Sequence, residues 1–280
     1  MKTRPTKVVI PVAGYGTRRL PITKTIEKCM LPILNRPIVD YIVQDCIRAG
    51  LTDILFVVSD DATQLQSYYG KNIELEKYLI SKGKEKEYDI VKNCGGGASI
   101  SYVIQPRDKY GTAVPLAVAK KFMGSSKNFV VLMGDDFVVR YDNESSIGTL
   151  IDDWQQNIAE HAMLGVEIPA SETYKYGVLK VDKNSHLQEI VEKPLPKNAP
   201  SNMINVSKYI FDKSIIDFLD TYMSQDRKGE YMLTDVMNMA LDAGQKICVG
   251  GSHGQFLDGG ELDGWLFANN YLRKIYSDRL

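Results

Sequence analysis

The stretch from Val8 to Arg19 constrains the fold more than any other part of this chain. It opens with Val8-Val9-Ile10, a short β-branched run that is typical of a strand buried on both faces. Pro11 ends the run, and Ala13-Gly14-Tyr15-Gly16-Thr17-Arg18 follows. Glycines just beyond a buried strand lie where ligands bind in open α/β sheets. The stretch therefore predicts an α/β fold with a ligand site at the end of its first strand.

The loop after this strand carries four cations and few acids. The cations are Arg18, Arg19, Lys24 and Lys28. The stretch is not a dinucleotide-binding fingerprint, because Arg19 stands where a third glycine is needed, and it lacks the Gly-Lys-Ser/Thr ending of a P-loop. A bare Gly-x-Gly is also common in ordinary turns. The cations favour a polyanionic ligand such as a nucleotide, because arginine offers a planar charged fork for phosphate oxygens.

Strand and helix patterns alternate along the rest of the chain. They predict strands near 54–58, 100–105, 129–133, 163–168, 176–179 and 255–258, and helices near 38–47, 113–122, 147–156 and 264–279. Residues 73–92 carry many charges and few apolar side chains, which predicts a solvated helix on the outside. We therefore expect a single α/β domain over residues 1–280, with a Rossmann-like, mainly parallel mixed sheet flanked by helices.

Polar residues follow several of these predicted strands. Gln105 closes one strand, with Gly111 in the next loop, whereas Asp135 and Asp136 close another and Asp258 closes the last. Carboxylates at the carboxyl end of a strand project into the ligand crevice, where they can bind Mg²⁺ beside phosphate oxygens. Each residue also has an ordinary interpretation, as a boundary glutamine or as an aspartate that caps a helix or a turn.

Composition argues against several other classes of protein. The formal net charge of -1 is not that of a dedicated nucleic-acid binder. No stretch is long enough to span a bilayer and the first apolar run is too short for a secretory signal, so we expect no membrane partner and a cytoplasmic location. The cysteines and histidines are widely scattered, which gives little support to a disulfide framework or a histidine-based metal site.

The motifs along the chain resemble a known family. The first loop, Gly14-x-Gly16-Thr17-Arg18 followed by a lysine and Met30-Leu31-Pro32, resembles the signature of the sugar-phosphate nucleotidyltransferases. Its longer form, P-V-A-G-x-G-T-R-x-L-P-x-T-K-x-I-x-K-x-M-L-P, is similar to the branch that joins UTP to glucose 1-phosphate. Later matches occur in the family's order, and they are L-x-G-D at 132–135, Y-G-V at 176–178, V-E-K-P at 191–194 and P-S-N at 200–202.

The resemblance implies an activity and a set of site residues. The reaction would transfer UMP from UTP to glucose 1-phosphate by Mg²⁺-assisted in-line attack, giving UDP-glucose and pyrophosphate. The nucleotide-binding residues would be Ala13, Gly14, Gly16, Thr17, Gln105 and Gly111, in a part spanning about 1–140. The sugar-phosphate-binding residues would be Gly177, Glu192, Lys193, Asn202 and Asn205, in a part spanning about 141–280. Arg18, Lys28 and Lys193 would be the catalytic cations, and Asp135 and Asp258 the Mg²⁺ ligands.

Two alternatives remain open at this point. A sister enzyme such as a glucose-1-phosphate thymidylyltransferase would share these motifs, because thymine differs from uracil by one methyl group. A non-catalytic regulatory subunit would be expected to lose motif acids or bases, which are all present here. One departure is that relatives often continue Asp-x-Gly with asparagine and lysine, where this chain has Glu261 and Leu262. We also expect a homodimer or homotetramer, with the apolar face of the last helix as one possible contact.

Overall fold

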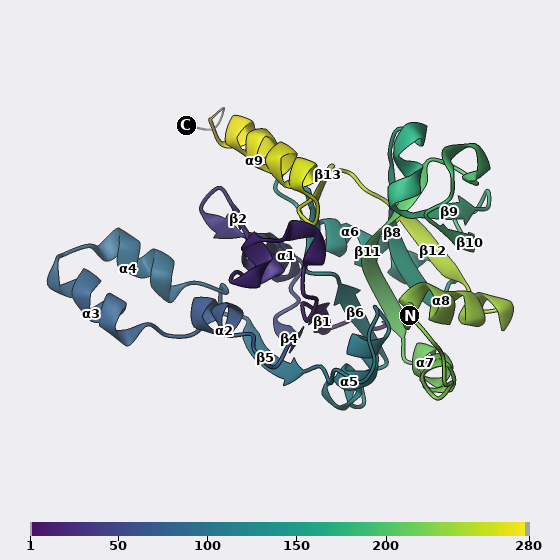
Figure 1. Cartoon of the computed structure of the whole chain (residues 1–280), viewed down its shortest axis with the longest axis horizontal. Helices are drawn as coiled ribbons and strands as arrows, with labels where there is room; N and C mark the ends of the chain where they lie inside the picture. Colours follow the sequence, from purple (N-terminus) through teal and green to yellow (C-terminus); the bar gives the residue numbers. More distant parts are fainter. Residues whose placement is uncertain (1, 278–280) are drawn as a thin grey trace.

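The structure is a computed structural model that describes residues 2–277, and it has a central sheet covered by helices (Figure 1). Nine strands of these residues form the sheet, in the order β10-β9-β11-β6-β1-β4-β5, with β8 beside β11 and β12 beside β8. The bounds are β1 Lys7–Pro11, β4 Asp53–Val58, β5 Ser99–Ile104, β6 Asn128–Leu132, β8 His161–Glu167, β9 Gly177–Val181, β10 Leu187–Glu192, β11 Met203–Asp212 and β12 Ile247–Gly251. The predicted fold class is confirmed.

The first half of the sheet is parallel. β1 runs parallel to β4 and to β6, and β4 runs parallel to β5. Val8 and Ile10 point into the core on one face, while Val9 between them packs into the core on the other. The carboxyl ends of these strands therefore meet at one edge, which is where the glycine loop after β1 begins.

The second half of the sheet is organised by β11, which the sequence analysis did not predict. β11 runs antiparallel to β6, β8 and β9. Its register with β8 shifts between Asn205 and Tyr209, where Ser207 has a positive φ of 55°. Lys208 occupies a buried position where the alternation of this strand calls for an apolar residue, so periodicity gave no clear signal. The edge strand β12 and helix α7 were likewise not predicted from the sequence.

Helices cover both faces of the sheet. Their bounds are α1 Ile38–Arg48, α2 Gln64–Tyr69, α3 Ile73–Ser81, α4 Glu85–Lys92, α5 Val114–Met123, α6 Ser146–Gln156, α7 Ile215–Met223, α8 Leu233–Asp242 and α9 Leu262–Ser277. One core joins the sheet to α1, α6 and α9, and a second joins it to α5, α7 and α8. α1 ends at Arg48, and Gly50 follows it with a φ of 77° that lets the backbone turn back on the helix. Within residues 2–277, no helix is both long and apolar enough to cross a membrane.

The charged segment at 73–92 forms an arm that extends away from the sheet (Figure 1). It was predicted as one solvated helix, but it folds as two, α3 and α4, which pack on each other. Gly83 has a φ of 65° between them, a conformation that ends the first helix. Ile73, Ile80 and Ile90 remain exposed on this arm.

The start of α8 corrects a smaller prediction. The sequence around Leu233-Thr234-Asp235 predicts the start of a helix, with Thr234 and Asp235 as its cap and helix-start charge. The cap position is Met232, without a side-chain cap, although Asp235 does lie in the first turn. Asp235 instead accepts hydrogen bonds from Tyr222 Oη and from Arg227 at 2.9 Å.

Candidate active site

The glycine loop follows β1 at the carboxyl edge of the sheet and continues into three short 3-10 helices. These helices are η1 Thr17–Arg19, η2 Ile22–Lys24 and η3 Lys28–Met30. Gly16 has a φ of 64°, and a Cβ there would lie 3.0 Å from the side chains of Thr23 and Lys28. Thr23 also donates to the Gly16 carbonyl over 2.9 Å. Gly14 and Thr17 stay exposed and Ala13 half-buried, so this part of the loop is accessible to a ligand.

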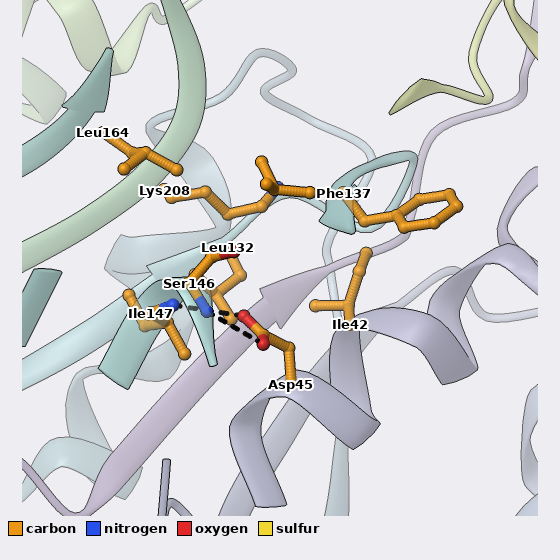
Figure 2. A pocket seen from close by; sticks show the side chains of 9 residues that line it. Ile42, Asp45, Leu132, Phe137, Ser146, Ile147, Leu164 and Lys208 are labelled. Carbon is orange, nitrogen blue, oxygen red and sulfur yellow. Dashed lines mark hydrogen bonds between the residues drawn. The ribbon is translucent and has the colours of Figure 1, made fainter. Parts of the chain in front are cut away.

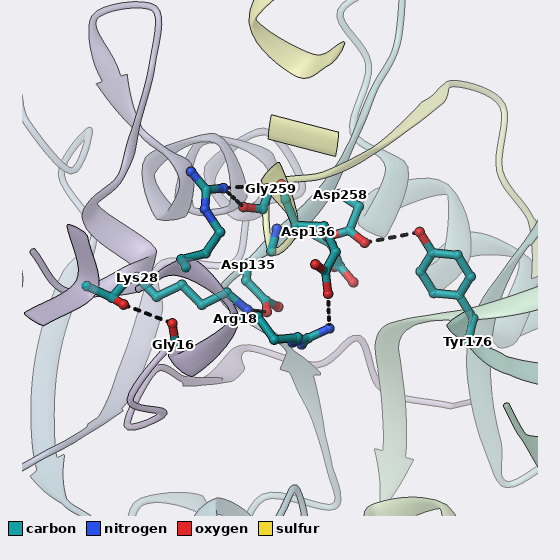
Figure 3. A network of polar contacts seen from close by, with 12 residues as sticks. Gly16, Arg18, Lys28, Asp135, Asp136, Tyr176, Asp258 and Gly259 are labelled. Atoms are coloured by element: carbon teal, nitrogen blue, oxygen red, sulfur yellow. Dashed lines mark hydrogen bonds and ion pairs between the residues drawn. The ribbon is translucent and has the colours of Figure 1, made fainter. Parts of the chain in front are cut away.

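Two carboxylates from distant parts of the chain meet beside this loop. A two-stranded ribbon, β7 Asp136–Val139 with β13 Gln255–Asp258, places Asp136 opposite Asp258, and the amide of Gly259 donates to the Asp135 carbonyl over 3.0 Å. A Cβ on Gly260 would lie 3.0 Å from Asp258 Oδ1 and Lys28 Nζ and 3.2 Å from Asp135 Oδ2. One cation and both predicted metal ligands therefore converge around a single point (Figure 3).

The charges in this cluster are unevenly paired. Lys28 Nζ lies 2.5 Å from Asp135 Oδ2. Burial alone would raise the pKa of Asp135, but the charge and hydrogen bond of Lys28 outweigh burial and lower it. Burial, with the charge of Asp135 beside it, raises the pKa of Asp258. Asp258 accepts hydrogen bonds from Tyr176 Oη at 3.1 Å and from the amide of Gly260 at 2.8 Å.

This pair of carboxylates fits a metal that enters with its substrate. No cluster of three or more His, Cys, Asp or Glu side chains among the described residues is arranged to hold a metal ion by itself. Mg²⁺ commonly binds through one or two carboxylates and completes its shell with water and substrate phosphates. Asp135 and Asp258 provide such a donor set.

The two arginines of the loop have different surroundings. Arg18, predicted as a catalytic cation, is exposed and forms an ion pair with Glu261. Arg19 is buried, and its guanidinium donates to the carbonyls of Gly259 and Glu261 at 3.2 Å each. It also lies 5.2 Å from the centre of the Trp265 ring. Arg19 thus holds the segment after β13 against the glycine loop, and Arg18 is the more accessible cation.

Gln105 and Gly111, the predicted base-binding residues, lie on the same edge of the sheet. The backbone N–H of Gln105 donates to the carbonyl of Val58 over 2.8 Å. The residue itself is half-buried just past β5. Gly111 has a φ of 119°, and a Cβ there would collide with the backbone of Tyr231. Tyr231 donates to the Tyr110 carbonyl at 2.8 Å and accepts from Ala113 at 2.9 Å. The need for glycine at 111 is explained by this close packing, whether or not a base binds there.

Of the predicted sugar-phosphate residues, Gly177, Glu192 and Lys193 gather at one end of the β9–β10 pair. Glu192 lies opposite Gly177 in the register. A Cβ on Gly177 would lie 3.3 Å from Glu192 Oε1, so the glycine leaves room for that carboxylate. Lys193 follows with a φ of 46° and donates its amide to the Tyr176 carbonyl over 3.0 Å, while its side chain is exposed.

The two predicted asparagines differ in how free they are. Asn202 is exposed at the start of β11. The side chain of Asn205 is hydrogen-bonded within the irregular part of β11. Its Nδ2 donates to Tyr209 Oη over 2.7 Å, and its Oδ1 accepts from the backbone amide of Ser207 over 2.9 Å. Asn205 therefore shapes the local backbone, and Asn202 is the more accessible of the two.

Sequence reasoning gave no role to three residues of this cluster. Tyr176 contacts Asp258, Lys208 on β11 pairs with Asp136, and Gly260 lies between the charged groups. Tyr176 could have been found, because it belongs to the quoted Y-G-V motif. Gly260 could also have been found, because it is the glycine of the Asp-x-Gly motif, whereas Lys208 had no local signal because its partner Asp136 is far away in sequence.

Comparison with known proteins finds similar sequences and structures over nearly the whole chain. Residues 7–274 match the model of a family described as nucleotidyl transferase. A UTP–glucose-1-phosphate uridylyltransferase of Staphylococcus epidermidis is 34% identical over 265 residues, which cover 93% of this chain and 89% of that protein. A crystal structure of apo UDP-glucose pyrophosphorylase matches with a TM-score of 0.87 and 28% identity, covering 99% of this chain and 100% of that one. A UTP-bound UGPase of Acinetobacter baumannii matches with a TM-score of 0.85 and 28% identity, covering 96% of this chain and 93% of that one.

Proposed function

The chain belongs to the nucleotidyl transferase family, and on this basis we propose that it transfers UMP from UTP to glucose 1-phosphate, giving UDP-glucose and pyrophosphate. The names of the similar proteins, a UTP–glucose-1-phosphate uridylyltransferase and a UTP-bound UGPase, support this reaction. Within the structure, the proposal depends most on the convergence of Lys28, Asp135 and Asp258 beside the glycine loop.

The reaction is an in-line displacement at the α-phosphorus of UTP. A phosphate oxygen of glucose 1-phosphate forms the new P–O bond, and the bond to the pyrophosphate oxygen breaks. Such chemistry needs positioning and charge neutralisation more than a covalent nucleophile. The backbone around Gly14 and Gly16 accommodates the phosphates, and Arg18 neutralises them. Lys28 has two further N–H donors beyond its bond to Asp135, which are available to a phosphate oxygen.

Asp135 and Asp258 are the residues that would hold Mg²⁺. When bound, the ion would act as a Lewis acid that stabilises the negative charge developing on the phosphate groups. Tyr176 keeps Asp258 oriented by its hydrogen bond, and Lys28 keeps Asp135 ionised.

The second substrate is assigned to the end of the β9–β10 pair. Lys193 would contact the phosphate of glucose 1-phosphate, while Glu192 and Asn202 would accept or donate hydrogen bonds to sugar hydroxyls. Gln105 would bind the uracil edge, since an amide offers both a donor and an acceptor. Tyr176 precedes Gly177 and contacts Asp258, so the proposed sugar side and metal side adjoin each other.

Self-association and location complete the proposal. We assign a homodimer or homotetramer, because Leu266 and Phe267 stay exposed on α9 while Ala268, Leu272 and Ile275 are buried within the chain. The arm adds exposed Ile80 and Ile90. A cytoplasmic location is part of the same proposal. UTP is highly charged and does not cross membranes freely, so the protein must work in a compartment that contains it.

The first experiment is a nucleotide panel. Pyrophosphate release is measured with glucose 1-phosphate and Mg²⁺ while UTP, dTTP, CTP, ATP and GTP are offered in parallel. Release with UTP well above the others supports the proposal, whereas preference for dTTP indicates a thymidylyltransferase. If none of these nucleotides gives pyrophosphate release, even with other sugar phosphates, a non-catalytic nucleotide-sugar binder is favoured.

The second experiment tests the carboxylates. Asp135→Asn and Asp258→Asn should each lower turnover by on the order of a hundredfold or more. Asp263→Asn is the matched control, because Asp263 is an exposed carboxylate only a few residues from Asp258. Unchanged Mg²⁺-dependent turnover in either site variant would contradict the metal assignment.

A further inference from the structure

Lys208 is a buried cation close to the candidate metal site. It lies on β11 and is 6% exposed. Its ammonium group donates to the backbone carbonyl of Asp136 over 2.9 Å and forms an ion pair with Asp136 Oδ1. The Asp136 side chain is itself only 14% exposed. Lys208 also lines a small internal cavity together with Asp45 and Ser146 (Figure 2).

Stability does not account for this pair. Taking two charges out of water costs about as much as their attraction returns, and a well-packed apolar pair is often as stable. The position of the pair is more informative. Asp136 follows Asp135 directly and lies opposite Asp258 in the β7–β13 register, so three carboxylates gather at one place (Figure 3).

Lys28 and Lys208 each form an ion pair with a different one of these carboxylates. Lys28 contacts Asp135, whose side chain is 34% exposed and therefore more accessible to a ligand than that of Asp136. Lys208 contacts Asp136 from the sheet, through both its carboxylate and its carbonyl. These two contacts fix Asp136 toward β11. Asp135 and Asp258 are left as the carboxylates that can face a ligand.

We propose that Lys208 determines the metal specificity of this site by holding the Asp136 carboxylate away from it. The inference rests on the proposed function, which gives the site its metal. With two carboxylates, the site suits Mg²⁺ that arrives with substrate phosphates. If the Asp136 carboxylate joined them, the site would have three carboxylates, enough charge and oxygen ligands to hold larger divalent cations without a nucleotide.

The test is Mn²⁺ binding to the nucleotide-free protein, followed by electron paramagnetic resonance. Lys208→Met removes the charge and keeps a side chain of similar length, and it should bind Mn²⁺ at least tenfold more tightly than the unaltered protein. Ca²⁺ should compete with Mn²⁺ better in this variant. Lys208→Arg keeps a cation and should bind as the unaltered protein does.

A double variant identifies the carboxylate responsible. Lys208→Met with Asp136→Asn should return to the weak Mn²⁺ binding of the unaltered protein. Asp136→Asn alone should leave Mn²⁺ affinity unchanged, and this measurement decides the question if Lys208→Met does not fold by circular dichroism. Unchanged affinity in folded Lys208→Met, or a tenfold loss in Asp136→Asn alone, would overturn the proposal. Because no substrate is used, a failure here is distinct from a failure of the proposed reaction.

Discussion

The hydroxyl of Tyr176 donates a hydrogen bond to Oδ2 of Asp258 over 3.1 Å. Tyr176 comes just before β9, and its carbonyl accepts from the amide of Lys193 over 3.0 Å. One residue therefore joins the proposed sugar-phosphate lysine to the second proposed metal ligand, Asp258. Figure 3 shows the contact of Tyr176 with Asp258. The two halves of the site are coupled through this side chain.

Tyr176→Phe should weaken the site without unfolding the protein. A hydrogen bond to a charged group contributes about 1.5–3 kcal/mol, so we expect turnover to fall by about tenfold or more, together with a higher Mg²⁺ requirement. The measurement is the initial rate as a function of Mg²⁺ concentration. Tyr174→Phe is the control, because Tyr174 is exposed nearby. An equal loss in both variants would show that the hydroxyl of Tyr176 has no special role.

Gly260→Ala should abolish most of the activity. The added Cβ would lie 3.0–3.2 Å from Lys28 Nζ, Asp258 Oδ1 and Asp135 Oδ2, so these groups would have to move apart. Because these shifts displace three groups of the proposed reacting centre at once, we expect turnover to fall by about tenfold. Gly251→Ala is the matched control, since a Cβ there meets no atom of the described residues within 4 Å. Near-normal turnover in Gly260→Ala would mean that this cluster is not where the chemistry occurs.

Glu261→Gln should improve nucleotide binding. Glu261 pairs with Arg18, and a triphosphate would have to compete with it for that guanidinium. An exposed ion pair contributes about 0.2–1 kcal/mol, so the KM for UTP should fall by about 1.5- to 5-fold, less so at high salt. Glu172→Gln, which breaks the exposed pair with Lys175, should leave KM unchanged. A higher KM in Glu261→Gln would indicate that Glu261 instead positions Arg18 for the nucleotide.

His161 should make the protein less stable in mild acid. Its ring is buried, Nδ1 accepts from the Asp212 amide at 3.1 Å, and Nε2 lies 2.8 Å from Gln245 Oε1. Burial lowers the pKa of His161, although the Gln245 hydrogen bond opposes this. The unfolded chain therefore gains a proton near pH 6.5, while the folded chain gains it only at lower pH. The free energy of unfolding should fall below pH 6.5 by up to about 1.4 kcal/mol per pH unit.

Urea unfolding between pH 5 and 7.5 checks this expectation. His161→Gln should be less stable at pH 7.5, because Asp212 and Gln245 lose a buried partner, but its stability should depend less on pH. His253→Gln changes an exposed residue and should keep the slope of the unaltered protein. The same slope in His161→Gln would assign the acid sensitivity to other groups.

Local patterns in the sequence determined a large part of this protein. The β-branched runs predicted β1, β4 and β6, because strands buried on both faces need continuous apolar segments. The apolar pattern over residues 38–47 predicted α1. The motifs from the glycine loop onward indicated the family, and the polar residues that close the strands marked the edge of the sheet where the site lies.

The tertiary structure decided which charged and close-packed groups meet. Arg18 with Glu261, Lys208 with Asp136, and Gly111 against Tyr231 each join residues from remote segments. In the sequence, one lysine or glutamate looks like any other, because charge carries no information about its distant partner. β11 brings Lys208 to the site although its polar residues hide the strand pattern. Such pairings depend on register and crossover geometry, which are fixed only when the whole sheet assembles.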